Sequence, residues 1–281
     1  MRWPDDAKNW PMVAYSRQIL HRPHRWHVQE AGDGPLILLI HGAGGATQSF
    51  RGIFPILAAT HRVVAVDLPG QGFTQLGARQ RCGLDQMAED LLSLCRNQGW
   101  APDLIVGHSA GVAIALRMWE LGLQSKRGIV GINAAVGNFK GVAGWLFPIM
   151  AKALAVTPFS ASIFASTTTR AAVRNLVKGT GSRLEQDELE HYYQLATDKA
   201  HVDATLCMMA QWSLDGLLAR LDRIDCPVHL ITGENDKAVP PQVSAQAAAR
   251  LPQARLTALP KLGHLAHEED PALIAELILK T

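Results

Sequence analysis

Short apolar runs alternate with longer amphipathic stretches along most of the chain. Six apolar runs have the length of a strand, at residues 36–40, 63–66, 104–106, 129–133, 228–231 and 255–259. Helix-forming stretches lie near residues 48–59 and 84–97, and from about Pro271 onward. Strands that are apolar almost throughout and separated by helices are typical of a mostly parallel sheet covered on both faces. The pattern therefore predicts an α/β fold with a mostly parallel central sheet and helices on both sides of it.

The alternation stops between Ala135 and Ser213, where the segment is rich in helix formers and bulky apolar residues. We predict an inserted helical cap at 136–213 over a core made of 1–135 and 214–281. Apolar side chains in such a cap suit a large, flat or apolar ligand. The candidates for ligand contact are Trp145, Phe147, Met208 and Trp212. The alternative is that most of them pack the cap onto the core.

One turn in this pattern carries chemistry. The apolar run 104–106 leads into Gly107-His-Ser-Ala-Gly111 and then into a helix-forming run. A G-x-S-x-G sequence between a strand and a helix is typical of a nucleophile elbow, which makes Ser109 the candidate nucleophile. Glycine is expected at 107 and 111 because a Cβ there would collide with neighbouring backbone. The alternative is a serine in an ordinary turn between a strand and a helix.

A serine nucleophile needs a base, and the base needs a carboxylate to orient it. The turn Gly233–Asp236 follows the strand 228–231, and we predict Asp236 as the acid. Glu234 and Asp222 are the alternatives, but Asp222 precedes the strand and is expected on the wrong side of the sheet.

The predicted base is His264, in the loop after the strand 255–259. The alternative, His267, is expected at the start of the next helix, in a solvated capping cluster with Glu268, Glu269 and Asp270. The other nine histidines are expected to be structural or exposed, including His21, His24 and His27 in a polar N-terminal arm.

The oxyanion of an acyl-transfer intermediate needs hydrogen-bond donors. We predict the backbone N–H of Ala110, which follows the nucleophile, and that of Ala43 in the glycine-rich loop 41–46. Gly42 is the alternative second donor. His41 is expected to brace this loop. A phosphate-binding loop is a poor alternative because neither G-x-x-x-x-G-K-[ST] nor G-x-G-x-x-G is present.

Composition narrows the class of protein. A chain of 281 residues with 48% hydrophobic residues supports one large domain. No apolar run reaches the length of a membrane span, and the polar N-terminus does not predict a secretory signal. Four cysteines without metal-like spacing predict free thiols in a reducing, cytoplasmic compartment. A formal net charge of +2 gives no reason to expect nucleic-acid binding, and no metal or cofactor is expected.

Several motifs together resemble the α/β-hydrolase superfamily over almost the whole chain. They are Gly42-Ala-Gly, Asp67-Leu-Pro-Gly-Gln-Gly72, Gly107-His-Ser-Ala-Gly111, Gly233-Glu-Asn-Asp236 and Gly263-His264. Residues 25–29, 41–51, 179–182, 208–212 and 262–269 further resemble the magnesium-chelatase accessory proteins of bacteriochlorophyll biosynthesis. This resemblance implies a role beside Mg²⁺ insertion into protoporphyrin IX in a phototrophic bacterium, with chelatase subunits as partners. It does not define a reaction.

The sequence thus favours a serine hydrolase acting on an ester-type bond. Ser109 argues against haloalkane dehalogenases and epoxide hydrolases of this fold, which resemble the chain but use aspartate at the elbow. One alternative is a non-catalytic module that binds a tetrapyrrole, whose propionates would suit the basic residues of the cap. Another is a peripheral membrane protein whose cap touches lipid.

Overall fold

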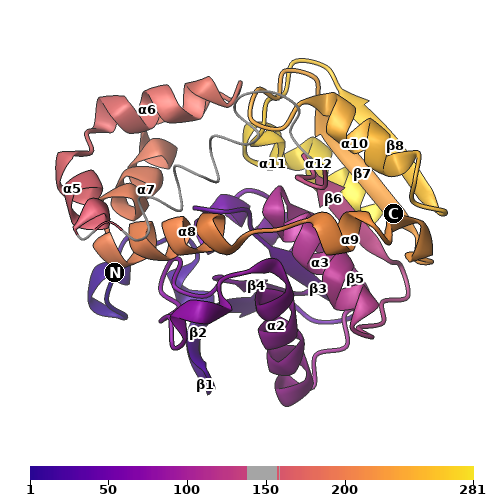
Figure 1. Cartoon of the computed structure of the whole chain (residues 1–281), viewed down its shortest axis with the longest axis horizontal. Helices are drawn as coiled ribbons and strands as arrows, with labels where there is room; N and C mark the ends of the chain where they lie inside the picture. The colour runs from indigo at the N-terminus through magenta and orange to yellow at the C-terminus, as the bar shows by residue number, and fades with distance from the viewer. Residues whose placement is uncertain (138–156, 158) are drawn as a thin grey trace.

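The computed structural model describes residues 1–137, 157 and 159–281. Within them the chain forms one eight-stranded sheet in the order β1-β2-β4-β3-β5-β6-β7-β8 (Figure 1). The strands are β1 (Ser16–His21), β2 (His24–Ala31), β3 (Leu36–Ile40), β4 (Arg62–Val66), β5 (Leu104–His108), β6 (Ile129–Ile132), β7 (Val228–Gly233) and β8 (Ala254–Leu259). Strand β2 is antiparallel to both β1 and β4, and the remaining pairs are parallel. The predicted mostly parallel sheet is confirmed.

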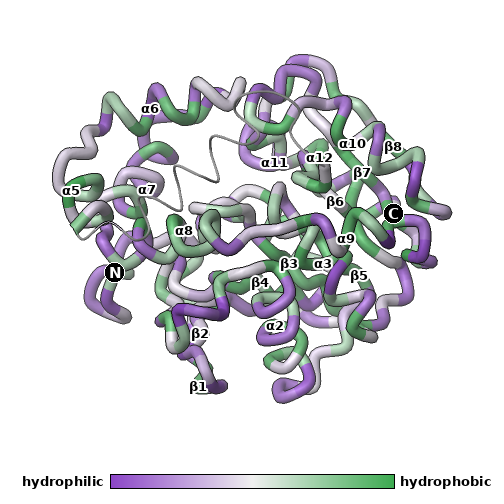
Figure 2. Tube along the Cα trace, viewed as in Figure 1, coloured by the Kyte–Doolittle hydropathy of each residue, from purple (hydrophilic) through white to green (hydrophobic). Residues whose placement is uncertain are grey.

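Helices cover both faces of the sheet, because the central strands are apolar on both sides. In β3, Leu38 and Ile40 belong to one core cluster, whereas Ile37 and Leu39 belong to another. The first cluster includes residues of α2 (Leu84–Gln98), α3 (Ala110–Glu120), α9 (Asp215–Leu218) and α10 (Pro241–Ala248). The second includes residues of α1 (Ile53–Ala58), α11 (Ala266–Glu269) and α12 (Pro271–Leu279). Figure 2 shows the hydropathy of each residue along the chain, with hydrophobic colouring on the central strands and on the helices beside them.

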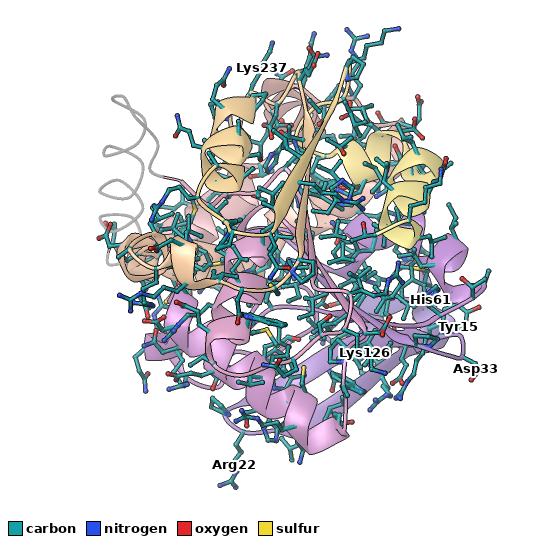
Figure 3. All side chains as sticks on the ribbon, turned by 90° about the vertical axis from the view of Figure 1, so that its right-hand side faces the viewer. Tyr15, Arg22, Asp33, His61, Lys126 and Lys237 are labelled. Atoms are coloured by element: carbon teal, nitrogen blue, oxygen red, sulfur yellow. The ribbon has the colours of Figure 1, made fainter. Side chains whose placement is uncertain are left out.

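Charged side chains lie on the outside of this core. Arg22, Lys126 and Lys237 are exposed and project from the periphery of the molecule (Figure 3). The four cysteines are buried and unpaired. Among the helices that the structure describes, none combines the length and the apolar character that a membrane span requires.

The helix expected near residues 48–59 is interrupted. A 3₁₀ turn, η3 (Thr47–Phe50), is followed by the separate helix α1. Pro55 has no N–H to donate to the carbonyl of Arg51, so one continuous helix cannot pass through both segments. Four further 3₁₀ turns are described: η1 (Asp5–Ala7), η2 (Val13–Tyr15), η4 (Arg79–Arg81) and η5 (Leu221–Arg223).

The expectation of a polar N-terminal arm is wrong, because residues 16–31 form the hairpin β1–β2 at one end of the sheet. His24 and His27 are buried in β2, whereas His21 remains partly exposed. Each buried ring meets a carboxylate: His27 Nδ1 lies 2.7 Å from Asp67 Oδ2, and His24 Nε2 lies 3.1 Å from Asp90 Oδ2. These partners offset the cost of burying polar rings, so a strand of polar sequence can pack against the core.

The described part of the predicted cap contains helices and no strand. These are α5 (Ser160–Thr167), α6 (Arg170–Gly179), α7 (Gln186–Thr197) and α8 (Lys199–Gln211). Helix α8 runs back along the core, and its Cys207 and Met208 join the larger core cluster (Figure 1). The limits of the cap at 136 and 213 stay a prediction.

Candidate active site

The turn at Ser109 is strained and sterically tight. Ser109 lies between β5 and α3 with φ 52° and ψ −116°, a conformation that non-glycine residues rarely adopt. A Cβ on Gly107 would lie 2.6 Å from the Gly111 carbonyl carbon, and a Cβ on Gly111 would lie 2.2 Å from Ile40 O. Contacts this short with backbone cannot be relieved by a side-chain rotation. The predicted need for glycine at both positions is confirmed.

A chain of hydrogen bonds joins the three residues predicted to form the triad. Ser109 Oγ lies 3.1 Å from His264 Nε2, and His264 Nδ1 lies 2.8 Å from Asp236 Oδ2. Because a carboxylate only accepts, Nδ1 carries the proton and Nε2 is free to accept the serine O–H. All three residues follow the carboxyl ends of parallel strands: β5, β7 and β8. This geometry suits a nucleophile and its general base, while their catalytic roles stay a prediction.

Asp236 is held from four directions. Its Oδ1 accepts the backbone N–H groups of Ala238 and Val239, each at 2.8 Å, and its Oδ2 also accepts Asn133 Nδ2 at 2.7 Å. Asn133 follows β6 in the left-handed conformation (φ 47°), which asparagine tolerates better than most residues. From the sequence, Asn133 was expected only at the end of a strand. The alternatives to Asp236 are placed elsewhere, since Glu234 is exposed and Asp222 precedes β7.

The two predicted oxyanion donors have suitable backbone positions. Ala110 is the first residue of α3, so its N–H has no partner within the helix. The Gly42 carbonyl accepts from His41 Nδ1 (2.7 Å) and from the Gly45 N–H (3.1 Å). In a trans peptide the N–H points opposite to the C=O, so the Ala43 N–H is turned away from both of these groups. It has no hydrogen-bond partner among the residues that the structure describes.

His41 braces the glycine-rich loop, as predicted. Its Nδ1 donates to Gly42 O and its Nε2 accepts the Leu68 N–H at 2.9 Å, so one neutral ring joins the ends of β3 and β4. Burial lowers the pKa of His41, which favours this neutral form.

The solvated cluster expected around His267 is largely wrong. His267 is fully buried, with its ring centroid 4.4 Å from that of His108 and 5.6 Å from that of Phe50. Burial lowers the pKa of His267 to about 3, so the ring is neutral. His108 in turn contacts both His267 and His264: its ring centroid is 4.8 Å from that of His264, and its Nε2 donates to the His264 carbonyl at 2.9 Å.

Glu268 is also buried, where it bonds Arg51 and the Tyr192 hydroxyl (2.5 Å). Burial raises the pKa of Glu268 to about 7, although Arg51 and Tyr192 act in the opposite direction. The remaining acids behave more nearly as expected. Asp270 caps α12 by accepting the Leu273 N–H (3.1 Å), and Glu269 accepts the Gly263 N–H (2.7 Å).

The four cap candidates divide into two pairs. Trp145 and Phe147 lie outside the described residues. Met208 is buried in the larger core cluster, and Trp212 packs against the same cluster. The structure therefore gives Met208 and Trp212 packing roles, and their contact with a ligand stays a prediction.

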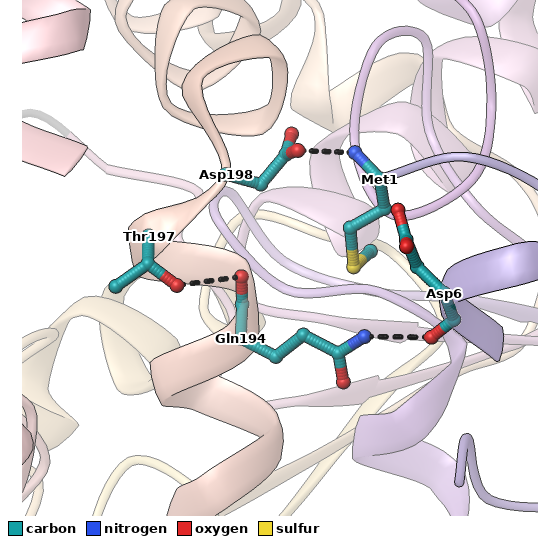
Figure 4. A pocket seen from close by; sticks show the side chains of 5 residues that line it. All are labelled: Met1, Asp6, Gln194, Thr197 and Asp198. Carbon is teal, nitrogen blue, oxygen red and sulfur yellow. Dashed lines mark hydrogen bonds and ion pairs between the residues drawn. The ribbon is translucent and has the colours of Figure 1, made fainter. Parts of the chain in front are cut away.

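Two surface hollows lie away from the triad residues. One is lined by Met1, Asp6, Gln194, Thr197 and Asp198, where Gln194 Nε2 donates to Asp6 O at 2.9 Å (Figure 4). The other lies between residues 70–79 and the start of α8. Ser109, Asp236 and His264 line neither hollow. The candidate active site is therefore located by the hydrogen bonds among these three residues and not by a pocket. Among residues 1–137, 157 and 159–281, no group of three His, Cys, Asp or Glu side chains is arranged to hold a metal ion.

Known proteins are similar to this chain in sequence and in fold. The sequence model described as “Alpha/beta hydrolase family” matches residues 37–277. The chain is 44% identical over 274 residues to the “Magnesium-chelatase 30 kDa subunit” of Rhodobacter capsulatus, covering 96% of this chain and 95% of that protein. An alpha/beta hydrolase fold protein from Burkholderia ambifaria has a TM-score of 0.80 at 23% identity, over 96% and 99% of the two chains. A thermophilic esterase from Thermogutta terrifontis has a TM-score of 0.71 at 21% identity, over 94% and 97%. At these identities the two solved structures establish the fold alone.

The buried His267 ring predicts a specific loss of stability in acid. Its pKa is lower in the folded chain than in the unfolded chain, so its contribution is present above pH 6.5 and is lost as the pH falls from there toward 3. Between pH 7 and pH 5, the wild type should lose about 2 kcal/mol more free energy of unfolding than His267→Phe. Urea unfolding at both pH values measures this. Phe50→Leu is the control, because it disturbs the same contact without removing a titratable group. Equal pH dependence in the wild type and His267→Phe would contradict the prediction.

Proposed function

The chain belongs to the alpha/beta hydrolase family, and we propose that it is a serine hydrolase acting on an ester-type bond. The observation that carries the proposal is the hydrogen-bonded chain Ser109–His264–Asp236, with its serine at a strained turn. Strained backbone in a folded protein is concentrated at functional sites. A serine with no catalytic task would not need a histidine and a buried carboxylate in line behind it.

The proposed reaction follows from the roles of these atoms. Ser109 Oγ attacks the substrate carbonyl carbon while His264 Nε2 takes the hydroxyl proton. Asp236 keeps the proton on Nδ1 and stabilises the imidazolium that forms. The N–H groups of Ala110 and Ala43 stabilise the tetrahedral oxyanion. His264 then gives its proton to the leaving alcohol, and a water molecule, activated by the same histidine, hydrolyses the acyl-serine.

We further propose that this chemistry serves magnesium insertion during bacteriochlorophyll biosynthesis. The support is the 44% identity, over nearly the full length of both chains, to a protein named as a magnesium-chelatase subunit. Chelatase subunits are therefore the proposed protein partners.

The same relationship supports a second proposal, in which the cap binds a tetrapyrrole without catalysis. Arg174 and Lys178 are exposed on α6 and could meet propionate groups. Arg170 is less available, because it pairs with Glu190 (2.6 Å) and lies over the Tyr193 ring.

Ester hydrolysis tests the first proposal. Ser109→Ala should lower kcat for aryl esters of short and medium acyl chains by about 10⁴-fold or more, because the nucleophile is lost while the fold remains. Ser93→Ala, at an exposed position of α2, is the matched control and should keep wild-type turnover. Purified wild type that hydrolyses none of these esters, or Ser109→Ala with wild-type turnover, would contradict the proposal.

Tetrapyrrole binding tests the second proposal. Fluorescence titration with protoporphyrin IX and its Mg²⁺ form should give the same Kd for the wild type and Ser109→Ala, and the variant should rescue a null strain. Trp212→Ala should weaken binding. The binding module is ruled out if neither tetrapyrrole binds, or if Ser109→Ala binds normally but fails to rescue.

Peripheral membrane contact is also a proposal, supported by exposed apolar side chains on α5 and on the residue that precedes it. Phe159, Ile163 and Phe164 are 74%, 61% and 51% exposed, more than large apolar side chains usually are. Phe164→Ser should lower the fraction of protein that sediments with anionic lipid vesicles, whereas Ser166→Ala on the same helix should not. Absence of sedimentation for the wild type would remove this option.

A further inference from the structure

Three successive peptide groups of the glycine-rich loop are each held by a side chain, one from His41 at the start of the loop and two from Gln71 and His201 outside it. His41 Nδ1 donates to Gly42 O (2.7 Å), on the peptide that carries the Ala43 N–H. Gln71 Oε1 accepts the Gly44 N–H at 2.8 Å. His201 Nε2 contacts Gly44 O at 3.2 Å. The loop that carries the second oxyanion donor is therefore fixed at every peptide from 42 to 45.

His201 belongs to helix α8, and its second nitrogen fixes the position of its proton. The Gly72 N–H donates to His201 Nδ1 at 3.1 Å, so Nδ1 is unprotonated. The proton of the neutral ring is then on Nε2, which donates to Gly44 O. Burial lowers the pKa of His201 to about 4 and keeps the ring in this neutral form. The Asp198 carboxylate holds the start of the helix by accepting the His201 backbone N–H (2.8 Å).

Gln71 makes a second link between the loop and the same helix. It is fully buried, and while its Oε1 accepts from Gly44, its Nε2 donates to Met208 Sδ at 3.3 Å. Gly44 has φ +74°, and a Cβ there would lie 3.5 Å from the Thr205 methyl carbon, so α8 also packs closely against the loop. Helix α8 thus holds the Gly44 C=O directly through His201, and it reaches the Gly44 N–H indirectly through Gln71, which is bonded to Met208.

We infer that His201 and Gln71 are positioning residues for the oxyanion hole, so that the Ala43 N–H is correctly aimed only when α8 is docked on the core. This inference rests on the proposed hydrolase function, because it assigns the loop a catalytic purpose. A displacement of α8 should therefore weaken the stabilisation of the tetrahedral oxyanion more than it weakens the binding of the ester.

Two amide substitutions at position 201 separate the two hydrogen bonds. His201→Gln places its amide where Nε2 lies, so it keeps the donor to Gly44 O and loses the acceptor for Gly72. His201→Asn places its amide where Nδ1 lies, so it keeps the acceptor for Gly72 and loses the donor to Gly44. Thr205→Val on the same helix is the control, because it keeps the methyl contact with Gly44 and loses only the hydroxyl bonded to His201 O (2.9 Å).

Two measurements follow. In His201→Asn, hydrogen exchange of the amides of residues 42–46 should rise, and kcat for an aryl ester should fall by about ten- to a hundredfold with little change in KM. His201→Gln and Thr205→Val should stay within about threefold of the wild type in kcat, as expected for variants that keep the loop in place. Gln71→Met should resemble His201→Asn, and it serves as the second variant if a substitution at 201 fails to fold.

The inference is overturned if His201→Asn leaves loop exchange at the wild-type level, or if His201→Gln is the more damaged variant. The second result would mean that His201 acts through Gly72 and not through the loop. Absence of Ser109-dependent turnover in the wild type would instead overturn the proposed function. In that case the exchange comparison still decides whether α8 holds the loop.

Discussion

Helix α3 begins so close to strands β3 and β5 that residues 107 and 111 have no room for a Cβ, and the geometry around Ser109 depends on this approach. Backbone strain of the kind seen at Ser109 costs on the order of 1–3 kcal/mol and persists only where neighbouring structure enforces it. Here the enforcement is visible. The Ser109 N–H donates to Ile132 O (2.9 Å), and its carbonyl accepts from Val112 (3.2 Å) and Ala135 (3.1 Å). The sheet therefore holds the Ser109 hydroxyl beyond the carboxyl end of β5, within reach of His264.

Around this point, neutral histidines join segments that are distant in sequence. His41 joins the ends of β3 and β4, His108 joins β5 to the loop of His264, and His201 joins α8 to the glycine-rich loop. Burial lowers the pKa of each of the three rings, so each is neutral. A neutral imidazole has one donor and one acceptor, and it can link two backbone groups in the interior without the cost of burying a charge.

The central sheet and the three aligned site residues were predictable from the sequence, because apolar runs, glycines at a tight turn and the order of polar residues after strands are local signals. The hairpin β1–β2 was not, because the carboxylates that allow His24 and His27 to be buried lie at Asp90 and Asp67, far along the chain. His267 and Glu268 were expected in solvent for the same reason. In sequence they resemble a capping cluster, whereas Glu268 is buried with Arg51 and the Tyr192 hydroxyl as its distant partners. The roles of Asn133, Gln71 and His201 depend on contacts between distant segments, and no local pattern marks them.

The proposed hydrolase function requires that the fold makes Ser109 unusually nucleophilic, and a covalent probe tests this without knowledge of the natural ester. An alkyl fluorophosphonate reacts with serine hydroxyls that a neighbouring base activates. Intact-mass spectrometry followed by peptide mapping should find one adduct, on Ser109, and Asp236→Asn should slow its formation because the orientation of His264 is lost. Absence of an adduct at Ser109 in the folded wild type, or labelling spread over other serines at equal rates, would show that the fold does not activate Ser109.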